Sequence, residues 1–201
     1  MGQDKNKSRL IEMVHAHEDD WDLIPLEMRT AELCEIAVLH HGAPLWWVPT
    51  SVRTLEICQA ALSNEHFSLS HVPEELRTYD LCMAAVSRDG WDLHEVPSYL
   101  RDIEMCMAAA RSDGWALQAV PEEHKTYEIC LAAVANDGLV LEIVPETLLC
   151  PEIYLAAVSS EGLALMLIDE DKRTPQLCVA AVLNNAEALQ YTPPGFEFQK
   201  R

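Results

Sequence analysis

The chain has 201 residues, of which 49% are hydrophobic, and its formal net charge at pH 7 is −19. This length and this apolar content suffice for one well-buried domain or one repeat array, and they exclude an intrinsically disordered chain. Such a negative field repels nucleic-acid phosphates and anionic lipid surfaces, so we expect neither as a partner. The same field steers a basic partner toward the protein, although acidity also serves solubility alone.

The sequence contains no candidate membrane segment. No stretch approaches the roughly 20 apolar residues needed to cross a bilayer. Residues 1–14 are polar and lack the apolar run of about 7–15 residues that a secretory signal needs. We therefore expect a cytoplasmic protein, and its seven cysteines fit a reducing compartment as free thiols.

A period of 24 residues runs through most of the chain. Proline, cysteine and leucine each recur at this spacing, and Asp169 and Tyr154 replace one proline and one cysteine. The consensus unit is roughly V-P-x-x-L-R-T-x-E-x-C-x-A-A-V-x-x-D-G-x-x-L. The cysteine column consists of Cys34, Cys58, Cys82, Cys106, Cys130 and Cys178. Such a regular period indicates a tandem repeat architecture.

In chain order, we expect a capping helix over residues 8–19, repeats over 20–193 and a tail over 194–201, all in one domain, 1–201. Each unit begins with a Thr or Asp helix cap, and an Ala-rich segment without Gly or Pro then favours a helix of about ten residues. A glycine ends this helix in the left-handed conformation. The segment W-x-L-x-x-V predicts a second helix of about six residues, which must end before the proline.

These elements predict an all-α fold, an α-solenoid of about seven 24-residue helix-turn-helix repeats. Neither helix is long enough to persist alone, so stacking on neighbouring units must stabilise both. The competing architecture is a leucine-rich repeat, which requires an L-x-L-x-x-N/C strand in every unit. The A-A-V segment after a capped start is spaced like a helix and favours the solenoid.

The units resemble a class of short tandem repeats, described as a domain of unknown function, in bacterial and protist proteins. The shared pattern is L-x-x-V-P-x-x-L-R-T-x-E-x-C-x-A-A-V, as in LSHVPEELRTYDLCMAAV at 69–86, and the resemblance covers about residues 20–193. It implies an all-helical array and brings no catalytic residues with it. The unit around 149–154 departs most, because Leu149 and Cys150 replace Arg-Thr and Tyr154 replaces cysteine.

The cysteine and arginine columns each allow a structural and a functional interpretation. Neighbouring cysteines should lie about 8–10 Å apart, too far for a disulfide, so we interpret them as small buried hydrophobic residues. Cys150 lies in the cap column instead and would be the reactive thiol. The arginine column precedes an acidic column by three residues, which predicts a ladder of ion pairs. The alternative is a row of arginines that grips an acidic ligand.

No catalytic motif is present, so we predict a non-enzyme without a cofactor. The segment HAHEDDWD at 15–22 approaches the H-x-H-x-D-H zinc motif, but Asp20 replaces its last histidine and no sheet is predicted to carry it. His17 and His41 share a repeat column, so the N-terminal histidines are expected to lie near one another. The candidate metal ligands are His15, His17, His40 and His41. This leaves open an alternative function as a metal-binding or metal-dependent regulatory protein.

Variable columns of a solenoid face solvent or a ligand, so a large apolar residue in a polar column marks a candidate contact. Trp46, beside Trp47, is the clearest case, and Tyr99 also lies among acids and serines. A second candidate is a stripe of i, i+4 pairs along the first helix of successive units. The stripe consists of Tyr79, Met83, Ile103, Met107, Tyr127 and Leu131. Trp91 and Trp115 share a column with leucines and are assigned to the core.

The predicted function is therefore a non-catalytic scaffold that binds a protein or peptide. Charge allows this partner to be basic, and the apolar stripe could equally bury itself in a homodimer or between units. Neither nucleic acid nor a membrane is expected as a partner.

Overall fold

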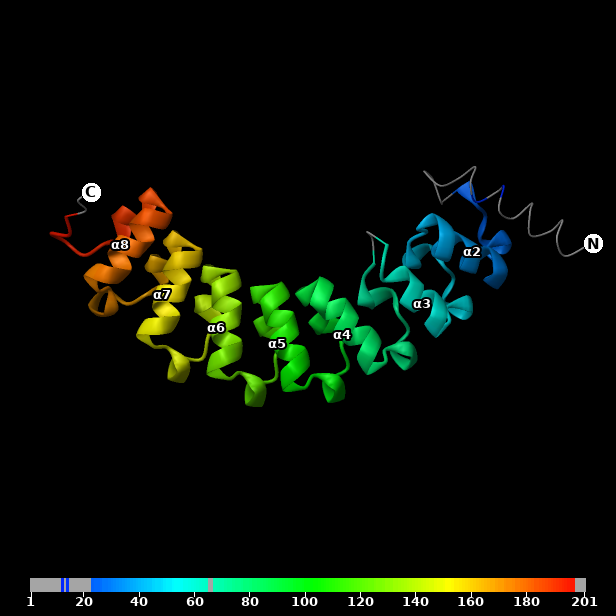
Figure 1. The fold of residues 1–201 in the computed structure, drawn as a ribbon, viewed down its shortest axis with the longest axis horizontal. Helices are drawn as coiled ribbons and strands as arrows, with labels where there is room; N and C mark the ends of the chain where they lie inside the picture. Colours follow the sequence, from blue (N-terminus) through cyan, green and yellow to red (C-terminus); the bar gives the residue numbers. More distant parts are fainter. Residues whose placement is uncertain (1–11, 13, 15–22, 65–66, 198–201) are drawn as a thin grey trace, which may run out of the picture. The chain divides into compact units, whose positions relative to one another are not determined.

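The computed structural model describes residues 12, 14, 23–64 and 67–197. Over these residues the chain forms helices and no strand, which confirms the predicted all-α repeat fold and excludes the leucine-rich repeat (Figure 1). The described helices are too short, or too polar, to traverse a lipid bilayer. Apart from Glu12 and Val14, the expected capping helix over 8–19 lies outside the described residues.

The chain divides into two compact units, residues 1–85 and 86–201, with the division inside helix α4 (Tyr79–Arg88). In the first unit, α2 packs against α3. Its described elements before α4 are η2 (Leu26–Met28), α2 (Ala31–His41), η3 (Leu45–Trp47), η4 (Thr50–Val52), α3 (Leu55–Ala61), η5 (Leu69–His71) and η6 (Glu74–Leu76), where η denotes a 3₁₀ helix. The single domain over 1–201 remains a prediction.

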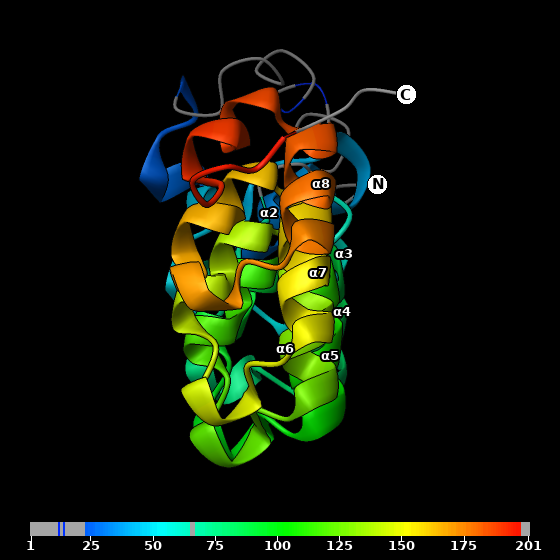
Figure 2. The same ribbon diagram turned by 90° about the vertical axis from the view of Figure 1, so that its left-hand side faces the viewer.

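The second unit stacks two layers of helices. Helices α5 to α8 lie side by side in chain order, and the six-residue 3₁₀ helices form a layer beside them, each in contact with the next (Figures 1 and 2). After α4 the elements are η7 (Gly90–Glu95), η8 (Ser98–Leu100), α5 (Ile103–Ser112), η9 (Gly114–Ala119), η10 (Glu122–His124), α6 (Tyr127–Asn136), η11 (Gly138–Ile143), η12 (Glu146–Leu148), α7 (Pro151–Ser160), η13 (Gly162–Leu167), η14 (Glu170–Lys172), α8 (Pro175–Asn184) and η15 (Ala186–Tyr191).

In most repeats a side chain caps the start of each of the two main helices. The Thr126 hydroxyl accepts a hydrogen bond from the Ile129 N–H and starts α6, as the cap column predicts. The Asp137 carboxylate accepts from the Leu139 N–H over 2.9 Å and starts η11. The predicted second helix exists but is 3₁₀, because i→i+3 bonds satisfy more backbone groups in only six residues before the next proline.

The glycine column has a different role from the one expected. Among described residues only Gly42 and Gly195 have positive φ, so the left-handed helix end is confirmed at Gly42 alone. In the second unit the glycine begins the 3₁₀ helix at a close approach to the following repeat. A Cβ on Gly138 would lie 2.2 Å from the Ala157 carbonyl oxygen, closer than atoms can pack. In the repeat that begins at η14, Ala186 occupies this column.

Side chains of the arginine column form hydrogen bonds with backbone carbonyl groups of two successive repeats. Arg101 Nε donates to the Val96 carbonyl over 2.8 Å, and its Nη1 donates to the Ala119 carbonyl of the next 3₁₀ helix over 2.9 Å. Arg173 makes the equivalent bonds, over 2.7 and 2.6 Å. The predicted ladder of ion pairs is wrong for both, because the guanidinium lies beneath the 3₁₀ helices, where carbonyl groups face it.

The cysteine column forms part of the core. All six cysteines of the column are buried, no disulfide joins any of the seven, and Cys150 alone is partly exposed. Burial raises the pKa of Cys34, Cys106 and Cys130 to about 11, against the smaller opposing effect of a nearby arginine or lysine. This confirms the interpretation of the column as small packing residues.

We expect Gly138→Ala to lower the free energy of unfolding by about 1–3 kcal/mol, because the added Cβ must push two repeats apart. Urea unfolding followed by circular dichroism measures this change. Ala186→Ser, in the same column of the last repeat, serves as the control and should shift stability little. Equal effects of the two substitutions would contradict the close-approach explanation.

Candidate functional site

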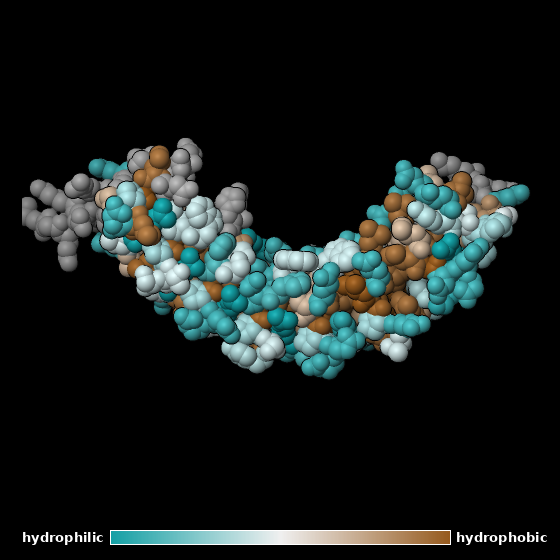
Figure 3. Space-filling model, turned by 180° about the vertical axis from the view of Figure 1, so that it is seen from behind, coloured by the Kyte–Doolittle hydropathy of each residue, from teal (hydrophilic) through white to brown (hydrophobic). Residues whose placement is uncertain are grey.

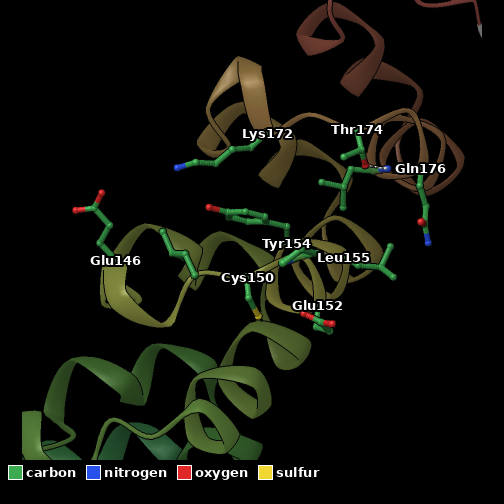
Figure 4. A pocket seen from close by; sticks show the side chains of 11 residues that line it. Glu146, Cys150, Glu152, Tyr154, Leu155, Lys172, Thr174 and Gln176 are labelled. Atoms are coloured by element: carbon green, nitrogen blue, oxygen red, sulfur yellow. Dashed lines mark hydrogen bonds between the residues drawn. The ribbon is translucent and has the colours of Figure 1, made fainter.

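A cavity of about 630 Å³ lies between the N-terminal ends of α7 and α8 (Figure 4). This volume falls within the range of about 300–1,000 Å³ that is typical of ligand sites. Its apolar lining comes from Leu149, Pro151, Leu155 and Leu177. The polar lining comes from Glu146, Cys150, Glu152, Tyr154, Lys172, Thr174 and Gln176.

The cavity lies where the repeat departs from its consensus. Leu149 occupies the arginine column and cannot donate to the carbonyl groups that Arg101 and Arg173 fasten. Cys150 occupies the Thr cap column, and its side chain makes no cap bond with α7. Tyr154 occupies the cysteine column, so a large side chain lies where the other repeats have a small one. The three replacements act together because all three side chains line the same space.

The Tyr154 hydroxyl has no hydrogen-bond partner within the described part of the chain. The residue as a whole is buried, at 7% exposed, but its hydroxyl oxygen keeps accessible surface. In Figure 4 this hydroxyl points toward the side of the cavity where Lys172 and Glu146 lie. The group is therefore available to a molecule that enters the cavity.

The charges around the cavity are mixed. Lys172 Nζ is 2.7 Å from Asp169 Oδ2, and this contact raises the pKa of the lysine, with a smaller contribution from Tyr154. Glu146 and Glu152 are exposed at the rim. The cavity therefore offers a cation, two carboxylates and a hydroxyl beside apolar walls.

The predicted stripe runs along α4, α5 and α6 and is partly exposed. In the second unit, Ile103 is 53% exposed and Met107, Tyr127 and Leu131 are half-buried. Tyr79 and Met83, in the first unit, are also half-buried. Helices α5, α6 and α7 each add an exposed carboxylate one turn before the residue in the Met107 column, whereas α8 has Gln176 at the carboxylate position. The pairs are Glu104 with Met107, Glu128 with Leu131, and Glu152 with Leu155.

The two predicted tryptophans of the first unit differ in exposure. Trp46 on η3 is 45% exposed, as a contact residue should be. Trp47 is 1% exposed, and the Arg29 guanidinium lies 4.8 Å from the centre of its ring. Its indole therefore packs inside the unit and is not presented to a partner. Tyr99 on η8, in the second unit, is 78% exposed.

The 3₁₀ layer of the second unit also exposes apolar side chains. Trp91 is 50% exposed, so its assignment to the core is wrong, and Trp115 is half-buried with its Nε1 2.8 Å from Asp137 Oδ2. Met166 is 49% exposed on η13. Figure 3 shows hydrophobic side chains gathered toward the C-terminal end of this unit. On each short helix, buried residues lie beside these exposed ones. The column of Trp91 also contains leucines, and for this reason the sequence pattern assigned Trp91 to the core.

The candidate metal ligands are only partly described. His40 and His41 lie in the last turn of α2, whereas His15 and His17 lie outside the described residues. Within residues 12, 14, 23–64 and 67–197, no three His, Cys, Asp or Glu side chains are grouped as metal ligands.

Two segments match one family model, described as a domain of unknown function (DUF4116). The matched residues are 78–125 and 102–149, offset from each other by one repeat. These matches support a repeat family of unknown function, and they end where the divergent unit begins. Neither the curated proteins nor the solved structures include a match to this chain.

We expect one thiol per chain to react with N-phenylmaleimide at pH 7.5 under native conditions, and we expect it to be Cys150. The six others are buried, and burial raises the pKa wherever a shift is resolved, for example at Cys178, so that they remain protonated thiols. Intact-protein and peptide mass spectrometry would count and locate the adducts. Early labelling at Cys178 would contradict the burial of the column.

Cys150→Thr should raise the free energy of unfolding by about 1 kcal/mol, because a hydroxyl can accept the bond from the third N–H of α7 that Cys150 leaves unmade. Denaturant midpoints would measure the gain. Thr174→Cys at the start of α8 is the reverse control and should lose a similar amount.

Proposed function

We propose that this chain is a non-catalytic repeat scaffold that binds a protein or peptide with a basic segment. The observation that supports the proposal is the acid-flanked stripe of the second unit, which consists of Ile103, Met107, Tyr127 and Leu131 with Glu104, Glu128 and Glu152. Large apolar side chains are partly exposed there beside exposed carboxylates.

Each part of the stripe suits a different part of such a partner. Apolar side chains gain about 25 cal/mol for every Å² of apolar surface that a partner removes from water. The carboxylates recur once per repeat from α5 to α7, so they repel one another when no cation is near. A segment with Lys or Arg relieves this repulsion, and the net charge of −19 speeds its encounter with the protein.

The remaining exposed aromatic residues are proposed as additional contacts. Trp46 would serve the first unit and Tyr99 the second, since aromatic side chains bury a large area with little loss of entropy. We further propose a cytoplasmic protein, in keeping with seven free thiols. A second copy of the chain is the competing occupant of the stripe and is one outcome of the test below.

The proposal is tested by selecting phage-displayed random dodecapeptides on the immobilised full chain. We expect enriched sequences that combine Lys or Arg with large apolar residues. Met107→Glu should weaken binding of the best peptide about tenfold or more, because it places a further carboxylate in the apolar stripe. Fluorescence anisotropy at two salt concentrations measures the loss and its electrostatic part.

Met166→Glu makes the same substitution on the 3₁₀ layer and serves as the matched control, which should bind the peptide as the wild type does. Trp46→Ala tests the first unit separately. Enrichment of acidic peptides, equal losses from both Met variants, or a homodimer that Met107→Glu dissociates would overturn the proposal.

A further inference from the structure

We propose that the cavity between α7 and α8 receives a large apolar side chain of the bound basic segment, and that the Tyr154 hydroxyl hydrogen-bonds the backbone of this segment. The inference rests on the proposed function and adds to it the position of the anchor. The observation that supports it is Tyr154, a residue that is 7% exposed. Its hydroxyl has no partner in the described chain and faces a cavity of about 630 Å³.

The cavity is continuous with the acid-flanked stripe. Glu152 and Leu155 line the cavity, and they occupy the same repeat columns as the pairs Glu128 with Leu131 and Glu104 with Met107. A segment that follows the stripe from α5 to α7 therefore arrives at the mouth of the cavity. The stripe supplies a shallow apolar surface, and the cavity supplies the depth in which one side chain can be fully buried.

The chemistry of the lining fits a peptide. Leu149, Pro151, Leu155 and Leu177 supply apolar walls, and burial of a large apolar side chain there removes its surface from water. A peptide backbone brings both a donor and an acceptor to the cavity. The Tyr154 hydroxyl can accept from its N–H or donate to its C=O.

The charged groups near the hydroxyl also include one hydrogen-bond donor and one acceptor. The Lys172 ammonium has three donor hydrogens, of which one is directed to Asp169, and the Glu146 carboxylate is an acceptor. At the rim, Glu146 and Glu152 can pair with a Lys or Arg that neighbours the anchor. The inferred motif is therefore one large apolar residue with a basic residue close to it in sequence.

The divergence of this repeat explains why the cavity lies here. A consensus unit would place an arginine at 149 and a small thiol at 154, so that the guanidinium bonds backbone carbonyls as Arg101 does. Leu149 and Tyr154 put an apolar wall and a tyrosine hydroxyl in place of these hydrogen bonds. The cost is a repeat boundary that lacks one of its regular connections.

Cys150 provides a native reporter for the test, because it lines the cavity and is the one thiol of seven that is not buried. The probe is the best dodecapeptide from the selection described above, used with the full chain. At saturating peptide, we expect the rate of Cys150 alkylation by N-phenylmaleimide to fall about tenfold. Conversely, a chain already alkylated at Cys150 should bind the peptide about tenfold more weakly than the untreated chain, whereas the reagent should not change the affinity of Cys150→Ser, measured against its own untreated sample.

Tyr154→Phe tests the hydroxyl alone. It should weaken peptide binding about threefold to tenfold, the range for one lost hydrogen bond. The matched control, Tyr191→Phe on η15, lies outside the cavity and should leave the affinity unchanged. Thermal unfolding verifies that both variants remain folded, and the alkylation result on the wild type does not depend on either variant.

The outcomes separate the two proposals. If the selection yields no basic, apolar peptide, the proposed function fails and the anchor site fails with it. If such a peptide binds and Met107→Glu abolishes binding, but Cys150 reacts equally fast with and without the peptide, the scaffold stands and the anchor site is refuted. Protection of Cys150 together with the loss in Tyr154→Phe supports the anchor site.

Discussion

Backbone contact between successive repeats is the constraint on which the second unit depends. Helices of ten residues and 3₁₀ helices of six have too few internal bonds to persist alone, so each repeat must lie against its neighbour with little space between them. Glycine makes this possible at Gly138, where any Cβ would strike the Ala157 carbonyl. Arginine then bonds the carbonyl groups that the short helices leave open, as Arg101 does on two successive repeats.

The same constraint explains why a change of three residues can produce a site. In a repeat array, local contacts are nearly independent of distant ones, so one boundary can loosen while the others hold. At Leu149, Cys150 and Tyr154 the chain lacks the guanidinium bonds and the helix cap, and a cavity lined by a tyrosine hydroxyl lies there. Missing local connections and a candidate binding site thus coincide, a frequent association in proteins.

The residues that pack the core and the residues that carry charge occupy different columns of the repeat. The core columns of cysteine, alanine and leucine are uncharged and buried, while exposed carboxylates recur at the helix starts and on the short 3₁₀ turns. Because acids repeat with the period of the fold, they form rows rather than scattered charges. Such rows are well suited to an extended basic segment and poorly suited to a single small ligand.

The 24-residue period, the cap residues and the helix-breaking prolines determine the all-α repeat, because these are local properties that stacking only reinforces. The regular spacing of the cysteines was enough to predict that their side chains are buried. The sequence did not reveal that glycine serves close approach rather than left-handed φ, or that arginine bonds carbonyls rather than carboxylates. Nor could it separate buried Trp47 from half-exposed Trp91, or show the cavity beside Tyr154. Each of these depends on which atoms of the next repeat come within a few ångströms, and only the tertiary structure determines that distance.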